Sequence, residues 1–156
     1  MSGHILALDI ATSCGWAHVT PRGGVIVSGT WDLSEYRDVG DRVASLHARV
    51  VHATMGFNTI VAYEVLRFGG NADAAHHWGA LWGAVRHAIS ERRGAFIEVA
   101  PAAWKRTAGL RAASGPEAAL AAARTRWHSD AITTEDEAVA RWVGVTAARK
   151  LLEEKR

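Results

Sequence analysis

Two acidic residues stand where strands are expected to end. Asp9 interrupts the apolar run of residues 5–10, and Glu64 directly follows the run of residues 58–63. An unpaired buried carboxylate costs on the order of several kcal/mol unless a metal ion or hydrogen-bond donors compensate it. Each residue has a structural explanation of its own. Backbone amides of the following turn could hydrogen-bond to the Asp9 carboxylate, and a carboxylate such as Glu64 is common at the end of a strand. The pair together favours a shared chemical role.

A third carboxylate is expected on the last helix, where Asp136 continues the apolar stripe of Ala140, Val143, Ala147 and Leu151. If a crossover helix makes the first and fourth strands neighbours, three carboxylates converge at one edge of the core. Such oxygen ligands suit Mg²⁺ or Mn²⁺. Two of these ions about 3.5–4 Å apart can activate water and stabilise the leaving oxygen of a phosphodiester.

The acids beside Asp136 are weaker metal-ligand candidates. Glu137 matches a capping box with Thr134 and lies four residues before Arg141, which favours a structural role. Glu135 is a secondary candidate because it lies close to the apolar face of the same helix.

Other catalytic chemistries lack the residues that they need. The single cysteine, Cys14, excludes an internal disulfide and a cysteine-based zinc finger. The eight histidines show no HxxxH or HExxH pattern, so we interpret most of them as surface or helix-face residues. We find no serine triad and no phosphate-binding cradle with convincing spacing, and we expect no nucleotide cofactor.

A sheet with covering helices must position these acids. The expected strands span residues 5–10, 16–19, 25–31, 58–63 and 95–99. The expected helices run over about 40–56, from a cap at Asp73 to about 89, from Pro101 through 106, from 114 to about 127, and from Thr134 onward. This order predicts an α/β protein of the ribonuclease H-like fold, with a five-stranded mixed sheet flanked by helices. Actin-like ATPases share the opening meander but need a second such domain.

Gly79 and Gly83 fall inside the helix that follows Asp73, where each costs roughly 1 kcal/mol relative to alanine. Two such glycines suggest the close approach of another element, with a second subunit as one option.

Length and composition predict one domain over residues 1–156. A chain of 156 residues buries roughly 70% of its unfolded surface and needs neither a disulfide nor a structural metal to hold a core. No apolar run approaches the roughly 20 residues of a membrane span, so we expect a cytoplasmic protein with no membrane partner. The net charge is −2 up to Glu64 (4 basic, 6 acidic residues) and +4 beyond it (14 basic, 10 acidic). Arginine makes up 15 of the 18 basic residues, which suits phosphate recognition.

Four segments with preserved order and spacing resemble the RuvC-type Holliday junction resolvases, including their phage-encoded members. They are residues 5–9 (ILALD) with 15–17 (GWA), residues 63–64 (YE) with 71–73 (NAD), 79 and 83–84, residues 100–101 (AP) with 104–105 (WK), and residues 136–140 (DEAVA). The resemblance spans nearly the whole chain. It implies a metal-dependent, structure-specific endonuclease of DNA recombination and repair that resolves four-way junctions by symmetric hydrolysis, in a bacterial host or encoded by a phage or prophage.

The resemblance also implies roles for individual residues. Asp9, Glu64 and Asp136 would be catalytic and hold two Mg²⁺ or Mn²⁺ ions, and Lys105 would act as a catalytic residue facing the phosphate near the scissile bond. The expected DNA contacts come from Arg67, Phe68, Lys105, Arg106 and Arg111. Phe68 lies one position from the aromatic that the family places near the crossover, and Arg111 partly replaces a lysine that this chain lacks.

The main departure from the family is Val139, which stands where a fourth acid is usual, three residues after the third. Either Glu135 or Glu137 substitutes for it, or the second metal ion is held more weakly.

The family acts as a homodimer, and we expect the helix with Trp78, Gly79, Trp82 and Gly83 to form the interface. Two alternatives stay open. One is a ribonuclease H-like nuclease that acts on forks, flaps or RNA–DNA hybrid, and the other is a junction-binding protein that has lost cleavage. A purely structural protein leaves Asp9 and Glu64 unexplained.

Overall fold

The computed structural model describes residues 3–56, 58–65 and 71–154, and within them five strands form one sheet in the order β3-β2-β1-β4-β5. The strands are β1 (His4–Asp9), β2 (Ser13–Val19), β3 (Val25–Asp32), β4 (Thr59–Glu64) and β5 (Ala95–Val99). The first three form an antiparallel meander, and β4 pairs in parallel with both β1 and β5. The predicted five-stranded mixed sheet is therefore confirmed, and its first and fourth strands are neighbours.

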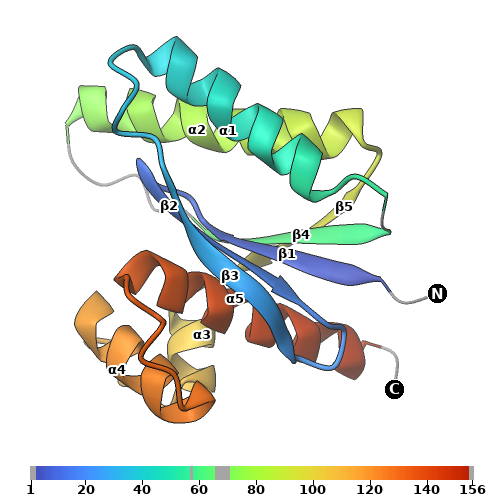
Figure 1. Ribbon diagram of the computed structural model, residues 1–156, viewed down its shortest axis with the longest axis vertical. Coiled ribbons are helices and arrows are strands. Elements are labelled where there is room, and N and C mark those ends of the chain that lie inside the picture. Colours follow the sequence, from blue (N-terminus) through green and yellow to red (C-terminus); the bar gives the residue numbers. More distant parts are fainter. Residues whose placement is uncertain (1–2, 57, 66–70, 155–156) are drawn as a thin grey trace.

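Helices cover both faces of the sheet (Figure 1). They are α1 (Val39–Ala53), α2 (Ala72–Glu91), α3 (Pro101–Thr107), α4 (Pro116–Trp127) and α5 (Glu135–Glu153). The pair α1 and α2 lies on one face, whereas α5 lies across the other face with α3 and α4 packed against it (Figure 1). None of the helices in the described segments is long and apolar enough to cross a membrane.

Alternation along β1 determines where its carboxylate points. Leu6 and Leu8 are fully buried in the cluster formed with α1 and α2, while Ile5 and Ala7 belong to the cluster formed with α5. Because successive strand residues face opposite sides of a sheet, Asp9 follows Ile5 and Ala7 onto the α5 face.

The same alternation holds along β4. Val61 and Tyr63 pack toward α1 and α2, and Ala62 packs toward α5, so Glu64 also lies on the α5 face. The two carboxylates therefore emerge on the same side of the sheet.

Several element boundaries differ from the predictions, including the starts of α2 and of β2. The cap of α2 is Asn71, whose side chain accepts a hydrogen bond from the amide of Ala74 at 2.9 Å. Asp73 lies inside the first turn, because the actual cap stands two residues before the predicted one. Strand β2 begins at Ser13, three residues before the predicted start at residue 16, since Ser13, Cys14 and Gly15 also pair with β3.

No described atom lies within 4 Å of a Cβ built at Gly79 or Gly83, apart from the helix's own neighbouring backbone. The close approach that we predicted at these glycines is therefore not made by any described part of this chain.

Candidate active site

The parallel pairing of β1 and β4 places two carboxylates at the same end of neighbouring strands. Leu8 is in register with Tyr63, so the next residues, Asp9 and Glu64, lie side by side. Both point to the α5 face, as the alternation of buried residues requires. The first two acids that we singled out in the sequence are thus brought together by strand register alone.

Asp136 reaches the same place because the start of α5 rests on β2. Thr134 caps this helix by accepting a hydrogen bond from the amide of Glu137 at 3.1 Å. A Cβ built on Gly15 would lie 1.9 Å from the carbonyl oxygen of Asp136, so the two backbones are in direct contact. Gly15 is also the register partner of Asp9 across the β1–β2 ladder. Only glycine at position 15 lets the helix carry Asp136 this close.

A cleft of about 320 Å³ opens where these elements meet. It is lined by four acids, one lysine and their neighbours, namely Asp9, Glu64, Glu135, Asp136, Lys105, Pro101, Trp104, Ser114, Pro116 and Val139. The predicted convergence of carboxylates from two strands and one helix is present in this cleft.

The charges of the cleft act on one another. Burial raises the pKa of the Asp9 carboxyl well above its ordinary value, and the negative charges of Glu64 and Asp136 raise it further. Burial also raises the pKa of Glu64, and the Trp104 indole and the Lys105 charge offset part of that rise. A cation placed among these carboxylates would relieve both the burial and the mutual repulsion.

Two side chains that sequence reasoning did not assign to the site orient its acids. The indole Nε1 of Trp104 donates a hydrogen bond to Glu64 Oε1 at 3.0 Å, and Ser13 Oγ donates one to Asp136 Oδ2 at 2.6 Å. Trp104 had a signal, since it lies in one of the segments with a family resemblance. Ser13 had none, because its partner lies 123 residues away.

Lys105 lies at the cleft, and its Nζ donates a hydrogen bond to the carbonyl oxygen of Ala112 at 2.8 Å. The other basic candidates are not gathered there. Arg106 and Arg111 are exposed and do not line the cleft. Arg67 and Phe68 lie outside the described residues.

The two weaker acid candidates separate clearly. Glu137 is buried against β3, where it accepts hydrogen bonds from Ser28 Oγ at 2.5 Å and from Arg141 at 3.1 Å, and it does not line the cleft. Glu135 lines the cleft together with Val139, the position where the family usually has a fourth acid. Since these two residues are four positions apart on α5, they share one helix face.

The donor chemistry of the cleft fits a hard divalent cation. No described residue donates a hydrogen bond that would lower the pKa of Asp9. Burial and the like charges of Glu64 and Asp136 therefore disfavour its ionised form, with no described donor to offset them. All candidate ligands are carboxylate oxygens, which suit Mg²⁺ or Mn²⁺ better than softer metals. The ligand oxygens of Asp9, Glu64 and Asp136 do not all lie within 4.8 Å of one another.

Comparison with solved structures identifies the fold. A structure of Thermus thermophilus RuvC matches with a TM-score of 0.74 and 19% sequence identity, over 96% of each chain. A structure of T. thermophilus RuvC in complex with a Holliday junction substrate matches with a TM-score of 0.77 and 19% identity, over 96% of this chain and 95% of the other. No protein-family model and no curated protein matches the sequence. The chain therefore has the RuvC fold, and the predicted ribonuclease H-like class is confirmed.

Proposed function

We propose that this chain is a divalent-metal-dependent endonuclease that resolves Holliday junctions by symmetric phosphodiester hydrolysis. The main support for this proposal is that four acids line one cleft, namely Asp9, Glu64, Asp136 and Glu135. Two further facts support the proposal: the chain has the fold of RuvC, and one of the matching RuvC structures holds a Holliday junction substrate.

In this proposal, Asp9, Glu64 and Asp136 hold two Mg²⁺ or Mn²⁺ ions. Such ions supply activation of water and stabilisation of the leaving oxygen. Trp104 and Ser13 fix the orientation of the Glu64 and Asp136 carboxylates through the hydrogen bonds that they donate. The ammonium group of Lys105 stands at the cleft as the counter-charge for the DNA phosphate.

We assign the fourth acid to Glu135. It shares the cleft with Val139 and is exposed, so its carboxylate is free to turn toward an ion. Glu137 is already engaged by Ser28 and Arg141 and has no part in metal binding. The exposed Arg106 and Arg111 are proposed to contact DNA outside the cleft. Arg67 and Phe68, which lie outside the described residues, stay proposed DNA contacts.

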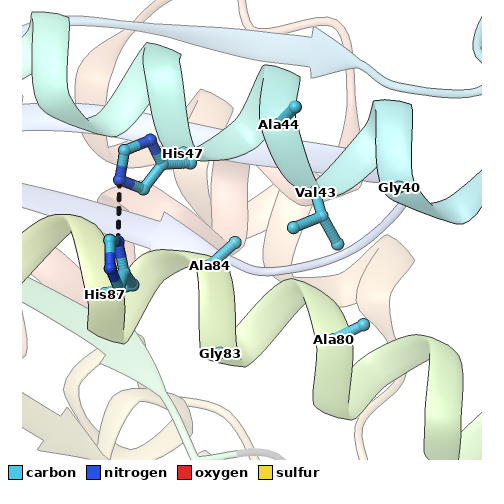
Figure 2. A pocket seen from close by; sticks show the side chains of 8 residues that line it. All are labelled: Gly40, Val43, Ala44, His47, Ala80, Gly83, Ala84 and His87. Atoms are coloured by element: carbon cyan, nitrogen blue, oxygen red, sulfur yellow. Dashed lines mark hydrogen bonds between the residues drawn. The ribbon is translucent and has the colours of Figure 1, made fainter.

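Symmetric cutting requires two copies, and the groove between α1 and α2 is the proposed dimer interface. Small or apolar residues line most of it, including Ala44, Ala80, Gly83 and Ala84 (Figure 2). No described atom approaches the Cβ position of Gly83, so a helix of a second copy can come close to the backbone there. Trp78 and Trp82 are half-buried against the core of their own chain and contribute only their outer edges.

The dimer is tested by sedimentation of the wild type and of two variants in which a residue of α2 is replaced by glutamate. Gly83→Glu places a carboxylate in the groove, at a position where the added Cβ meets no described atom of its own chain outside its helix's neighbouring backbone, and should convert a dimer to a folded monomer. His76→Glu introduces the same charge at an exposed position outside the groove and should leave the dimer intact. A wild type that is monomeric at micromolar concentration would contradict this interface.

The activity is tested by incubating the wild type and Asp9→Asn with a labelled synthetic four-way junction. Linear duplex, fork and RNA–DNA hybrid serve as control substrates, with Mg²⁺, with Mn²⁺ and with chelator alone. Paired symmetric nicks that need the metal and vanish in Asp9→Asn, while junction binding persists, are the expected result. Preferential cutting of fork or hybrid would keep the chemistry and replace the substrate.

A second candidate function is junction binding without cleavage, and Val139 is the observation that favours it. This side chain lines the cleft and offers no oxygen ligand. If the wild type binds the junction and does not cut it with either metal, Val139→Asp becomes the informative variant. Cleavage gained by Val139→Asp would identify the missing ligand as the cause.

A further inference from the structure

A second cluster of ligand atoms lies on the opposite face of the sheet from the acidic cleft. His47 comes from α1, and His87 and Glu91 come from α2. His47 Nε2 lies 2.9 Å from Glu91 Oε2 and 3.1 Å from His87 Nδ1 (Figure 2 shows the pair of histidines). Within residues 3–56, 58–65 and 71–154, this is the only set of three such side chains whose ligand atoms all lie within 4.8 Å of one another.

The hydrogens available to these three atoms do not satisfy all of them. A neutral imidazole nitrogen carries either one hydrogen or a lone pair. If His47 Nε2 carries the hydrogen, that hydrogen must be shared between Glu91 and His87. If it does not, its lone pair faces the carboxylate of Glu91. A metal cation at the centre would accept a lone pair from each of the three atoms at once.

The spacing is close to that of a tetrahedral metal site. Zinc ligands lie about 2.0–2.1 Å from the ion, so two ligands in tetrahedral geometry are about 3.3 Å apart. The separations of 2.9 Å and 3.1 Å need to widen by only a few tenths of an ångström, and the ligand atoms of His87 and Glu91 lie within 4.8 Å of each other. His87 and Glu91 are four residues apart on α2 and so share a face, which presents both of them to His47.

The donor types select the metal. Two imidazole nitrogens and one carboxylate suit Zn²⁺ and related transition metals, whereas Mg²⁺ prefers oxygen ligands alone. In the single chain the cluster is accessible, since His87 and Glu91 are exposed and His47 is about one quarter exposed. His47 and His87 also line the α1–α2 groove proposed above as the dimer interface, so the ion would lie beside that interface.

We propose that His47, His87 and Glu91 bind one Zn²⁺-class ion, which fastens the C-terminal part of α2 to α1. All three ligands come from one chain, and none of them lines the acidic cleft. Three protein ligands leave a fourth position for water or another small ligand. Since the ion would bind the folded arrangement of two helices, it should stabilise the fold.

The test measures zinc binding directly. Protein stripped with a chelator is titrated with ZnCl₂ in excess Mg²⁺, and bound zinc is counted by equilibrium dialysis and elemental analysis. The wild type should bind one tight zinc ion per chain. His87→Ala and Glu91→Gln should each lose at least about tenfold in affinity. His76→Ala, at an exposed histidine on the same helix, and Asp9→Asn, in the cleft, should bind zinc like the wild type.

Thermal unfolding provides a second readout that does not depend on activity. ZnCl₂ should raise the Tm of the wild type and of His76→Ala and leave the Tm of His87→Ala unchanged. Because His87 is exposed, the metal-free Tm of His87→Ala should match that of the wild type. The proposal is overturned if the wild type binds no zinc in excess Mg²⁺, if His87→Ala and Glu91→Gln bind it as tightly as the wild type, or if only Asp9→Asn loses it.

Discussion

The contact between Gly15 and the start of α5 is the most direct test of how the cleft is built. Gly15→Ala adds one methyl group, whose carbon would lie 1.9 Å from the carbonyl oxygen and 2.2 Å from the carbonyl carbon of Asp136. Both partners are backbone atoms, so no change of side-chain rotamer relieves the clash. The helix start and the strand must therefore move apart.

The size of that movement follows from the distances. Cβ atoms essentially never approach other heavy atoms closer than 3.0 Å, so the separation must grow by at least 1.1 Å, which is 3.0 minus 1.9. Overpacking of this kind typically costs about 1–3 kcal/mol and occasionally more. Because the clash is between backbones, we expect a loss of about 2–4 kcal/mol in the free energy of unfolding. A displacement of about 1 Å at Asp136 is also enough to lower a catalytic rate by about 100-fold.

Urea unfolding measures the loss in the free energy of unfolding. Junction cleavage and Mn²⁺ binding measure the effect of displacing Asp136. Gly29→Ala is a matched control, because the three atoms nearest to its added methyl group belong to the Trp16 side chain, at 3.1–3.3 Å, and a side chain can shift where backbone cannot. This control should cost at most about 1 kcal/mol and keep wild-type cleavage. A Gly15→Ala variant that unfolds and cleaves like the wild type would refute the contact. Lost stability with full cleavage would refute its role in placing Asp136.

The remaining predictions concern the other acids and the buried thiol. Glu135→Gln should lower the cleavage rate at least about tenfold and leave urea unfolding unchanged. Glu137→Gln should lose about 1–3 kcal/mol of stability, because it loses the ion pair with Arg141, and should keep most of the cleavage rate. The reverse pattern would assign the fourth metal ligand to Glu137. The pKa of Asp9 is raised in the fold, so the folded state holds a proton that the unfolded state releases as pH rises. In chelator, the wild type should therefore lose stability relative to Asp9→Asn as the pH rises above about 4, the ordinary pKa of an Asp carboxyl, and Mg²⁺ should reduce that loss. Parallel urea titrations check this, and a stability difference that does not change with pH would contradict it. Burial raises the pKa of the Cys14 thiol, so iodoacetamide at pH 8 should modify it only after unfolding, and rapid labelling of the native protein would show that the thiol is accessible.

The order and pairing of the elements were predictable because they depend on strong local patterns. Branched apolar runs gave the strands, and the change to a three-to-four-residue period gave the helices. The cap of α2 was predicted wrongly, since Asn71 and Asp73 are both good capping residues and only the actual start of the helix distinguishes them. The start of β2 was missed because its pairing with β3 extends the strand into residues that otherwise favour a turn.

The acidic cleft was predictable to the extent that period and strand order carry the information. Alternation along β1 and β4, together with the stripe on α5, is sufficient to bring Asp9, Glu64 and Asp136 to one place. Contacts between residues far apart in the chain produce no periodic pattern in the sequence. The Ser13–Asp136 hydrogen bond spans 123 residues, and the His47–His87 contact joins two helices with a separation of 40 residues. Such pairs fit no spacing rule, which is why the histidines showed no metal motif.

The dependence of the cleft on α5 also determines when the site can first exist. Asp9 and Glu64 come from the first half of the chain, while Asp136 arrives on the last helix, which lies across β1 and β2 and supplies much of the core on that face. During synthesis, the strands can pair before α5 has left the ribosome, but the set of acids is incomplete until that helix docks. A chain interrupted before residue 135 lacks the apolar side chains that α5 adds to this half of the core, and it lacks the third acid. Docking of α5 therefore completes this half of the core and the set of acids in one event.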